Sequence, residues 1–291
     1  MRKMNGIWMI CLTFIMLAAT VLPVQACTSW MASGDSVAGG GTLVVKNRDW
    51  MPGDITSLKL MKSNRDLSYF VLFGNLEGSA NHGGINEAGL VLLELSTPPN
   101  TPRGEVPPLA KSFDADWILG HYRTTDEVIL ALTKNEWQTQ PVFLIVADQN
   151  KVAYIEVGTS GRVAVKEMVN GAMIHANEYQ EASMQDLNPK LQPGVDNSLA
   201  LYERKRLLKA REQIESKSIF TLADMKRFAQ DPVVWYEQRE MRTYASFIVQ
   251  HRSNGQEPLI WVRLTNPNEG VKEAQFTLSE AMSGKALELL H

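Results

Sequence analysis

Cys27 is the residue of this chain whose type and position could do chemistry. It follows Ala26, at the end of a segment laid out like a secretory signal: a positively charged start, an apolar stretch over residues 7–22 and small residues over 24–26. Cleavage after Ala26 would leave a thiol and a free α-amine on one residue. We therefore predict that signal peptidase removes residues 1–26 and that the mature chain begins with a nucleophile beside its own base.

An N-terminal cysteine needs no histidine to act as a nucleophile. A free thiol has a pKa of about 8.5 and an α-amine one of about 7.7–8.0, so part of the amine is unprotonated at neutral pH. The amine can take the thiol proton, directly or through water, while the sulfur attacks a carbonyl. None of the five histidines lies in a nucleophile-like motif, so we expect the α-amine to be the base.

The N-terminal segment has two other interpretations. Its apolar stretch is shorter than the roughly 20 residues that span a bilayer as a helix, so we expect no stable membrane span. Residues 24–27 also partly fit a lipoprotein signal, in which a lipid is attached to the cysteine, although Gln25 fits that pattern poorly. Acylation of the α-amine would remove the base, so a lipid-anchored envelope protein without catalysis stays open as an alternative.

Composition excludes several classes of function. The formal net charge is −3, and no basic run exceeds residues 203–206, so we expect no nucleic-acid partner. The only other cysteine, Cys11, lies in the predicted signal, so the mature chain has no internal disulfide and depends on a buried core. No cluster has metal-ligand spacing and no glycine loop suits a phosphate, so we expect neither metal nor cofactor.

A predicted hairpin would bring a charged segment beside Cys27. Residues 27–31 fit a strand, Gly39–Gly41 a turn, and residues 42–46 a returning β-branched strand. The segment Lys46-Asn47-Arg48-Asp49-Trp50 ends that second strand. Its charges are therefore expected next to the start of the first.

The charged segment could orient and activate the nucleophile, although taken alone it also fits a hydrated strand end. Asp49 could accept a hydrogen bond from the α-amine, and either Lys46 or Arg48 could favour the thiolate. In a regular strand Asp49 and Lys46 point to opposite faces. If both reach the thiol, the chain must bend near Arg48.

The remaining elements form alternating blocks of strands and helices. Strands are expected at residues 58–61, 69–73, 90–95, 142–147, 152–157, 163–166, 173–176, 246–251, 259–264 and 273–276. Helices are expected at residues 115–122, 126–133, 198–215, 222–230 and the C-terminus, and the proline-rich residues 97–109 read as a surface loop. This order favours antiparallel sheets covered by helices in one α+β domain over residues 27–291.

Three motifs resemble the N-terminal-nucleophile cysteine hydrolases and acyltransferases. Cys27 followed by residues 46–50 is similar to the isopenicillin N acyltransferase relatives and to the bile salt hydrolase and penicillin V acylase group, with Lys46 where that group has arginine or glutamine. Residues 84–90 resemble the Asn-Glu-x-Gly-Leu turn and strand of the group. Asn177 lies where bile salt hydrolases carry an asparagine that donates to the oxyanion. The order and spacing of the motifs cover most of the mature chain.

The resemblance implies a fold and a reaction. The fold is a four-layer αββα sandwich, with two antiparallel sheets between helical layers and Cys27 at the start of a central strand. The reaction is cleavage of an amide C–N bond through an acyl-enzyme on Cys27. Asn177 would hold the tetrahedral oxyanion, together with a backbone N–H near residues 92–96.

Two departures from the bile salt hydrolase pattern limit what carries over. Ser96 stands where those enzymes have a second asparagine. Where they have an arginine at the start of a late helix, the nearest match is Leu201, and Arg204 one turn further on is the candidate replacement. Arg204 and Arg206 otherwise read as a solvated helix face. The departures favour the broader acyltransferase-like branch over bile salts as substrates.

The sequence thus predicts an exported enzyme of the periplasm or the extracellular space. Its expected activity is that of a cysteine amidohydrolase acting on a small-molecule, linear amide. Acyl transfer to an amine at the same site and dipeptidase activity stay open. The acyl group, the leaving amine and assembly into a homo-oligomer are not determined by the sequence.

Overall fold

The computed structural model describes most of the chain beyond the predicted signal. The described residues are 27–63, 66–75, 81–98, 114–134, 140–191, 193–194, 197–234, 237–238 and 241–290. The predicted signal peptide and nearly all of the proline-rich loop lie outside them. Among the described residues, no helix combines the length and the apolar character needed to cross a bilayer.

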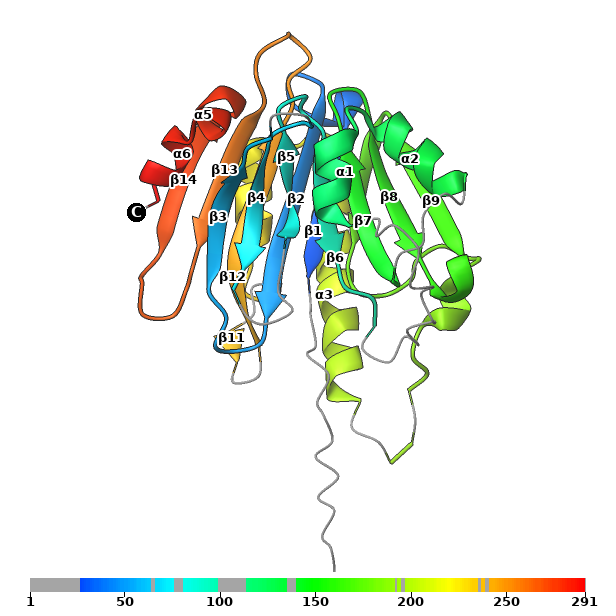
Figure 1. The fold of residues 1–291 in the computed structure, drawn as a ribbon. Helices are drawn as coiled ribbons and strands as arrows, with labels where there is room; N and C mark the ends of the chain where they lie inside the picture. Colours follow the sequence, from blue (N-terminus) through cyan, green and yellow to red (C-terminus); the bar gives the residue numbers. More distant parts are fainter. Residues whose placement is uncertain are drawn as a thin grey trace, which may run out of the picture.

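Two antiparallel sheets form the centre of the molecule (Figure 1). The first has the strand order β10-β1-β2-β12-β13-β14, with β11 paired to β12, and the second runs from β3 to β9 in sequence order. The first sheet contains β1 (Thr28–Ser33), β2 (Thr42–Trp50), β10 (Gly171–His175), β11 (Glu237–Gln238), β12 (Met241–Gln250), β13 (Leu259–Leu264) and β14 (Lys272–Thr277). The second contains β3 (Thr56–Met61), β4 (Tyr69–Gly74), β5 (Asn81–Asn86), β6 (Val91–Leu95), β7 (Val142–Ala147), β8 (Val152–Val157) and β9 (Val163–Met168).

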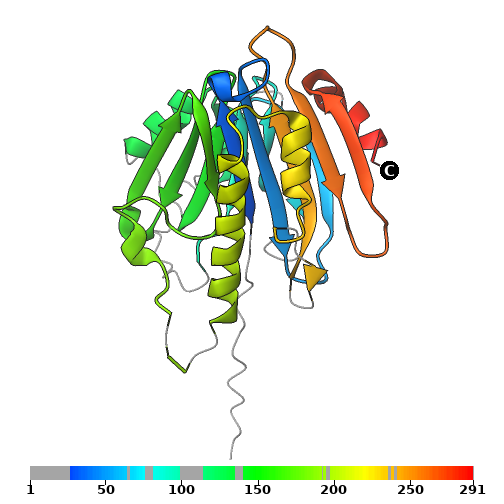
Figure 2. The same cartoon turned by 180° about the vertical axis from the view of Figure 1, so that it is seen from behind.

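Helices cover the outer faces of both sheets. Helices α1 (Ala115–His121) and α2 (Thr125–Thr133) pack on the second sheet, and α3 (Ser198–Glu215) and α4 (Leu222–Ala229) pack on the first (Figures 1 and 2). Near strand β14 lie α5 (Leu278–Ser283) and α6 (Lys285–Glu288), and single 3-10 turns occur at Gly34–Ser36, Thr159–Gly161 and Gln185–Leu187. The layers follow the order helix, sheet, sheet, helix, which confirms the predicted αββα sandwich.

Three apolar clusters correspond to the three contacts between layers. The largest fills the space between the sheets and includes Met31, Val44 and Phe247. One of the others lies under α3 and α4, around Trp30 and Trp261, and the third lies under α1 and α2. Strand β2 is buried along its whole length because both of its faces are covered. Any side chain on its middle residues, charged or not, is therefore inside the protein.

The expected elements that fall within the described residues are present, with ends shifted by a few residues. Thr124 caps α2, accepting a hydrogen bond of 3.2 Å from the Glu127 N–H. Strand β5 was not predicted from the sequence, because Gly83 and Gly84 weaken its β-strand pattern. Both glycines are needed there, since a Cβ would lie 2.3 Å from the Leu92 carbonyl oxygen at the first and 2.0 Å from the Phe70 oxygen at the second.

Candidate active site

Cys27 lies immediately before β1. This strand pairs with β2, which carries Lys46 and Asp49, and with β10, which ends two residues before Asn177. Its residue is only 2% exposed, at the end of the apolar cluster between the sheets. On one side Thr28 pairs with Asn47 of β2, and on the other Ser29 pairs with His175 at the end of β10. The predicted hairpin is present, and it places the charged segment that begins at Lys46 next to Cys27.

The side chains of β2 alternate between the two faces of the first sheet. Lys46 and Arg48 point between the sheets, toward β5 and β6, whereas Asn47 and Asp49 point toward the helices. The irregularity at this point lies in the neighbouring strand, because the register of β12 shifts by one residue opposite Arg48 and Asp49. Two sets of charges therefore approach Cys27 from opposite sides of the sheet.

Lys46 is the cation on the side between the sheets. Its Nζ donates to the backbone oxygen of His82 at 2.8 Å and to that of Glu94, and the side chain is fully buried. Burial lowers the pKa of Lys46, while the charges of Cys27 and Glu94 act to raise it. Among the neighbouring charges, that of Cys27 has the largest effect on the pKa of this ammonium.

Arg48 is committed to other partners on the same face. Its guanidinium donates to the Asp54 carboxylate, to Thr56 Oγ1 at 2.6 Å and to His82 Nε2 at 3.0 Å. Burial and the neighbouring cations hold the pKa of His82 well below its usual value, so a neutral ring can accept this bond. The contacts of Arg48 fix the segment after β2, and they favour Lys46 over Arg48 as the cation for the thiol.

Asp49 belongs to a buried network on the helical side. Its carboxylate accepts hydrogen bonds from Arg206 of α3 and from Thr243 Oγ1, the latter at 2.5 Å. Arg206 also donates to Thr28 Oγ1 at 2.6 Å, directly beside Cys27. Burial raises the pKa of Asp49, and the charge of Arg206 opposes that rise. The network connects β1, β2, β12 and α3.

The electrostatics of Arg206 also involve Cys27. Burial by itself lowers the pKa of the guanidinium, but the charges of Asp49 and Glu203, and to a smaller extent that of Cys27, raise it overall. Arg206 therefore remains a cation inside the protein. Cys27 has a cation on each side of its sheet, Lys46 on one and Arg206 on the other.

The structure does not bring Arg204 to the other site residues. Its side chain is 52% exposed, and its nearest acid is Glu178, at 3.9 Å. Our interpretation of Arg206 as part of a solvated helix face is wrong, since this residue is fully buried. Its spacing from Ala210 and Gln213, both buried on the same face of α3, is the signal that could have identified it.

Asn177 follows β10 by two residues and bridges the two sheets. Its Nδ2 donates to the Ser96 carbonyl oxygen just after β6, at 2.6 Å, and this nitrogen carries a second hydrogen for another acceptor. Its Oδ1 is buried without a hydrogen-bond partner among the described residues. The predicted oxyanion donor thus lies at the same end of the first sheet as Cys27, since β10 pairs with β1. Its role stays a prediction.

The described residues hold no group of three or more His, Cys, Asp or Glu side chains arranged as a metal site. The chemistry available in this part of the chain is that of a thiol, two buried cations, a carboxylate and an amide. Such a set suits nucleophilic attack on a carbonyl with electrostatic stabilisation of the anion formed.

Comparisons with known proteins agree with this geometry. Residues 37–267 match the model of the family described as "Acyl-coenzyme A:6-aminopenicillanic acid acyl-transferase". No curated protein sequence matches the chain.

Similar folds occur in solved structures of acylases. Penicillin V acylase from Agrobacterium tumefaciens is 14% identical, with a TM-score of 0.58 and 87% of each chain covered. A mutant of the conjugated bile acid hydrolase from Clostridium perfringens is 12% identical, with a TM-score of 0.56, covering 87% of this chain and 93% of that one. At these identities the likeness shows the fold. Because the family model spans more than half of the sequence, this chain belongs to the acyl-coenzyme A:6-aminopenicillanic acid acyltransferase family of N-terminal-nucleophile enzymes, which act on amide bonds.

Proposed function

We propose that this protein is an exported cysteine amidohydrolase whose mature form begins at Cys27. The observation that carries the proposal is the position of Cys27 at the start of a central strand, with Lys46 and Arg206 acting on it from opposite faces of the sheet. A buried thiol without a function would not need two buried cations, each of which is costly to desolvate. The family to which the chain belongs supports the same chemistry.

The reaction would begin with formation of a thioester. The α-amine of Cys27 takes the thiol proton as the sulfur bonds to the amide carbon. The oxygen of that amide becomes an anion, which the Nδ2 of Asn177 and a backbone N–H near residues 92–96 would hold. When the C–N bond breaks, the α-ammonium returns the proton to the leaving amine. Water then hydrolyses the thioester, which releases the acid and restores the thiol.

Export is part of this proposal because the mechanism requires a free α-amine on Cys27. The charged start, apolar stretch and small-residue site of residues 1–26 support removal by signal peptidase. The periplasm or the extracellular space is the proposed location. A small linear amide is the proposed substrate class, which the shared fold with proteins named penicillin V acylase and conjugated bile acid hydrolase supports.

Two measurements on protein secreted by a bacterial host test the proposal. Mass spectrometry of the N-terminal peptide should find an unmodified Cys27 as the first residue, whereas a lipid-modified cysteine would support the non-catalytic alternative. The second measurement is turnover of a panel of penicillin V, glycine-conjugated bile salts, N-acyl amino acids and fatty amides. Cys27→Ala should abolish turnover without changing the melting temperature, and Cys27→Ser should leave a slow enzyme. An active Cys27→Ala variant would sink the proposal.

Acyl transfer to an amine is the second candidate, because the matching family model carries the name of an acyltransferase. The chemistry up to the thioester is the same, and an amine then replaces water as the acceptor. A thioester donor supplied with a series of amines separates the two reactions. Faster formation of amide than of free acid would favour the transferase.

A further inference from the structure

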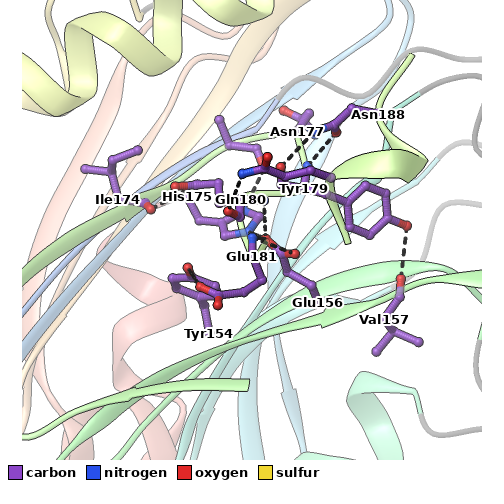
Figure 3. Close-up of polar contacts among 12 residues, drawn as sticks. Tyr154, Glu156, Val157, Ile174, His175, Asn177, Tyr179, Gln180, Glu181 and Asn188 are labelled. Atoms are coloured by element: carbon purple, nitrogen blue, oxygen red, sulfur yellow. Dashed lines mark hydrogen bonds and ion pairs between the residues drawn. The ribbon is translucent and has the colours of Figure 1, made fainter. Parts of the chain in front are cut away.

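A second group of buried polar side chains lies beside the candidate site, between the two sheets. Glu156 on β8 and His175 at the end of β10 form an ion pair of 2.9 Å, and both side chains are fully buried (Figure 3). The rings of Phe143 and Tyr154 enclose the imidazole, with centroids 4.5 Å and 4.8 Å away. The mechanism described above does not use this pair.

Both ring nitrogens of His175 make hydrogen bonds. Its Nδ1 faces the Ala176 carbonyl oxygen at 2.7 Å, and a carbonyl can only accept. Its Nε2 faces Glu156 Oε1, which also accepts from the backbone N–H of Gln180 at 2.6 Å. Each ring nitrogen therefore has an oxygen partner, which fixes the orientation of the imidazole between the two sheets.

Glu156 also holds the chain where it turns back after β10. Besides the bond from Gln180, the carboxylate accepts from the backbone N–H of Glu181 at 3.2 Å (Figure 3). Because it also bonds to His175, this one side chain holds both ends of the segment 175–181. Side-chain bonds tie the same turn further: Gln180 Nε2 reaches the Ile174 oxygen at 3.1 Å, and Tyr179 exchanges two hydrogen bonds with Asn188.

Asn177 lies within the segment that Glu156 holds. His175 fixes the chain two residues before it, and the backbone groups of Gln180 and Glu181 fix it a few residues after. Between these two anchors, the Asn177 side chain extends toward the second sheet and donates to the Ser96 oxygen. Within the described part of the chain, the Asn177 side chain makes no other hydrogen bond, so we expect the two anchors on either side of it to control its position.

We propose that the Glu156–His175 ion pair is a positioning device that holds Asn177 where it can donate to the oxyanion. This inference rests on the proposed function, since it concerns the oxyanion of that reaction. A buried ion pair is weak as a source of stability, because desolvation offsets most of its attraction. Such a pair can instead hold a hydrogen-bond donor accurately beside a developing negative charge, which an apolar pair could not do.

The experiment compares two reactions of Cys27 that differ in their need for an oxyanion donor. 4-Nitrophenyl hexanoate acylates the thiol through a tetrahedral oxyanion, and release of 4-nitrophenolate in a single turnover gives the rate. Iodoacetamide alkylates the same thiol by displacement at carbon, with no oxyanion. If Glu156 positions Asn177, only the first rate should depend on Glu156.

Three variants give the readout. Glu156→Leu should slow acylation at least about tenfold, up to the 10²–10³ typical of a lost oxyanion donor. Its alkylation rate should stay within about twofold of wild type. Glu156→Gln should restore acylation to near the wild-type rate, because its amide can still accept from the backbone and donate to a neutral His175. Should Glu156→Leu fail to fold, His175→Gln provides the same comparison.

His251 provides a matched control. It is also a buried histidine with both nitrogens bonded, to Thr42 Oγ1 at 2.8 Å and to the Gly89 oxygen at 2.7 Å. Thr42 pairs with Ser33 at the far end of β1, about 20 Å from Cys27 at 3.3 Å per residue. His251→Gln should lower the melting temperature and leave both rates of Cys27 unchanged.

The outcomes separate this inference from the proposed function. Wild-type protein that forms no acyl-enzyme on Cys27, by mass spectrometry, would overturn both. Normal acylation of wild type with an unchanged rate in Glu156→Leu would overturn the positioning role alone. A parallel fall of both rates would also overturn it, because it would mean a general disturbance of the thiol.

Discussion

Asp49 on β2 and Arg206 on α3 form a fully buried ion pair across 157 residues of sequence. The same guanidinium donates to Thr28, the first residue of the strand that follows Cys27. The pair therefore connects the charged segment after the hairpin to a helix of the outer layer. Because the pair lies beside Thr28, next to Cys27, we expect substitutions in it to lower both the stability and the activity of the protein.

Substitution of Arg206 should destabilise the protein strongly, whereas substitution of Arg204 should not. Arg206→Gln leaves the Asp49 carboxylate buried with one neutral donor, so we expect a loss of about 3–5 kcal/mol in the free energy of unfolding and a large fall in turnover. Arg204→Gln changes an exposed side chain on the same helix and should stay within about 0.5 kcal/mol. Urea unfolding of both variants checks this. Equal effects would contradict the assignment of Arg206 to the site.

Lys46 should control the reactivity of Cys27. Lys46→Met has a similar shape but no charge, so the thiolate loses a buried attractive partner and two carbonyl oxygens lose their donor. We expect alkylation by iodoacetamide at neutral pH to slow at least about tenfold, which corresponds to about 1.4 kcal/mol. Lys59→Met is the control, since Lys59 lies on β3 over the Phe73 ring. An unchanged rate in Lys46→Met would rule out this role.

Asn177 should affect acylation but not the nucleophile. Asn177→Ala removes the proposed donor to the oxyanion, and we expect acylation by 4-nitrophenyl hexanoate to fall by about 10²–10³. Alkylation by iodoacetamide should be unaffected. The control is Asn170→Ala. Asn170 lies on the exposed turn before β10, where it donates to the Asp35 carboxylate. If Asn177→Ala acylates at the wild-type rate, another group must hold the oxyanion.

Glu203 should give the protein a pH-dependent stability. Burial raises its pKa from 4.5 to about 7, although Arg206 opposes the rise. The folded state therefore binds a proton more tightly than the unfolded state, so the contribution of Glu203 is fully present below about pH 4.5 and is lost as the pH rises toward 7. At about 1.4 kcal/mol per pKa unit the loss is a few kcal/mol at most. Urea unfolding from pH 4.5 to about 8 should show wild type losing stability relative to Glu203→Gln, and parallel curves would contradict it.

Local signals in the sequence were sufficient for most of the fold. The turn at Gly39–Gly41 marked the first hairpin, α2 was predicted to within one residue, and α3 was predicted with its observed ends. These signals act between residues close in sequence, through capping and backbone conformation. Strand β5 was missed because its glycines serve a close approach to Leu92 and Phe70, which are contacts with other strands.

The sequence by itself predicted Cys27 as the candidate nucleophile, the charged segment beside it and the family resemblance, because each of these lies in a short run of residues. Only the tertiary structure decided which arginine of α3 faces inward and which face of β2 each charge occupies. Arg204 and Arg206 differ by two residues, about 200° around a helix of 3.6 residues per turn, so packing of α3 on the first sheet buries one and exposes the other. The link between Glu156 and His175 likewise exists only because two sheets meet face to face, and no spacing in the chain could have predicted it.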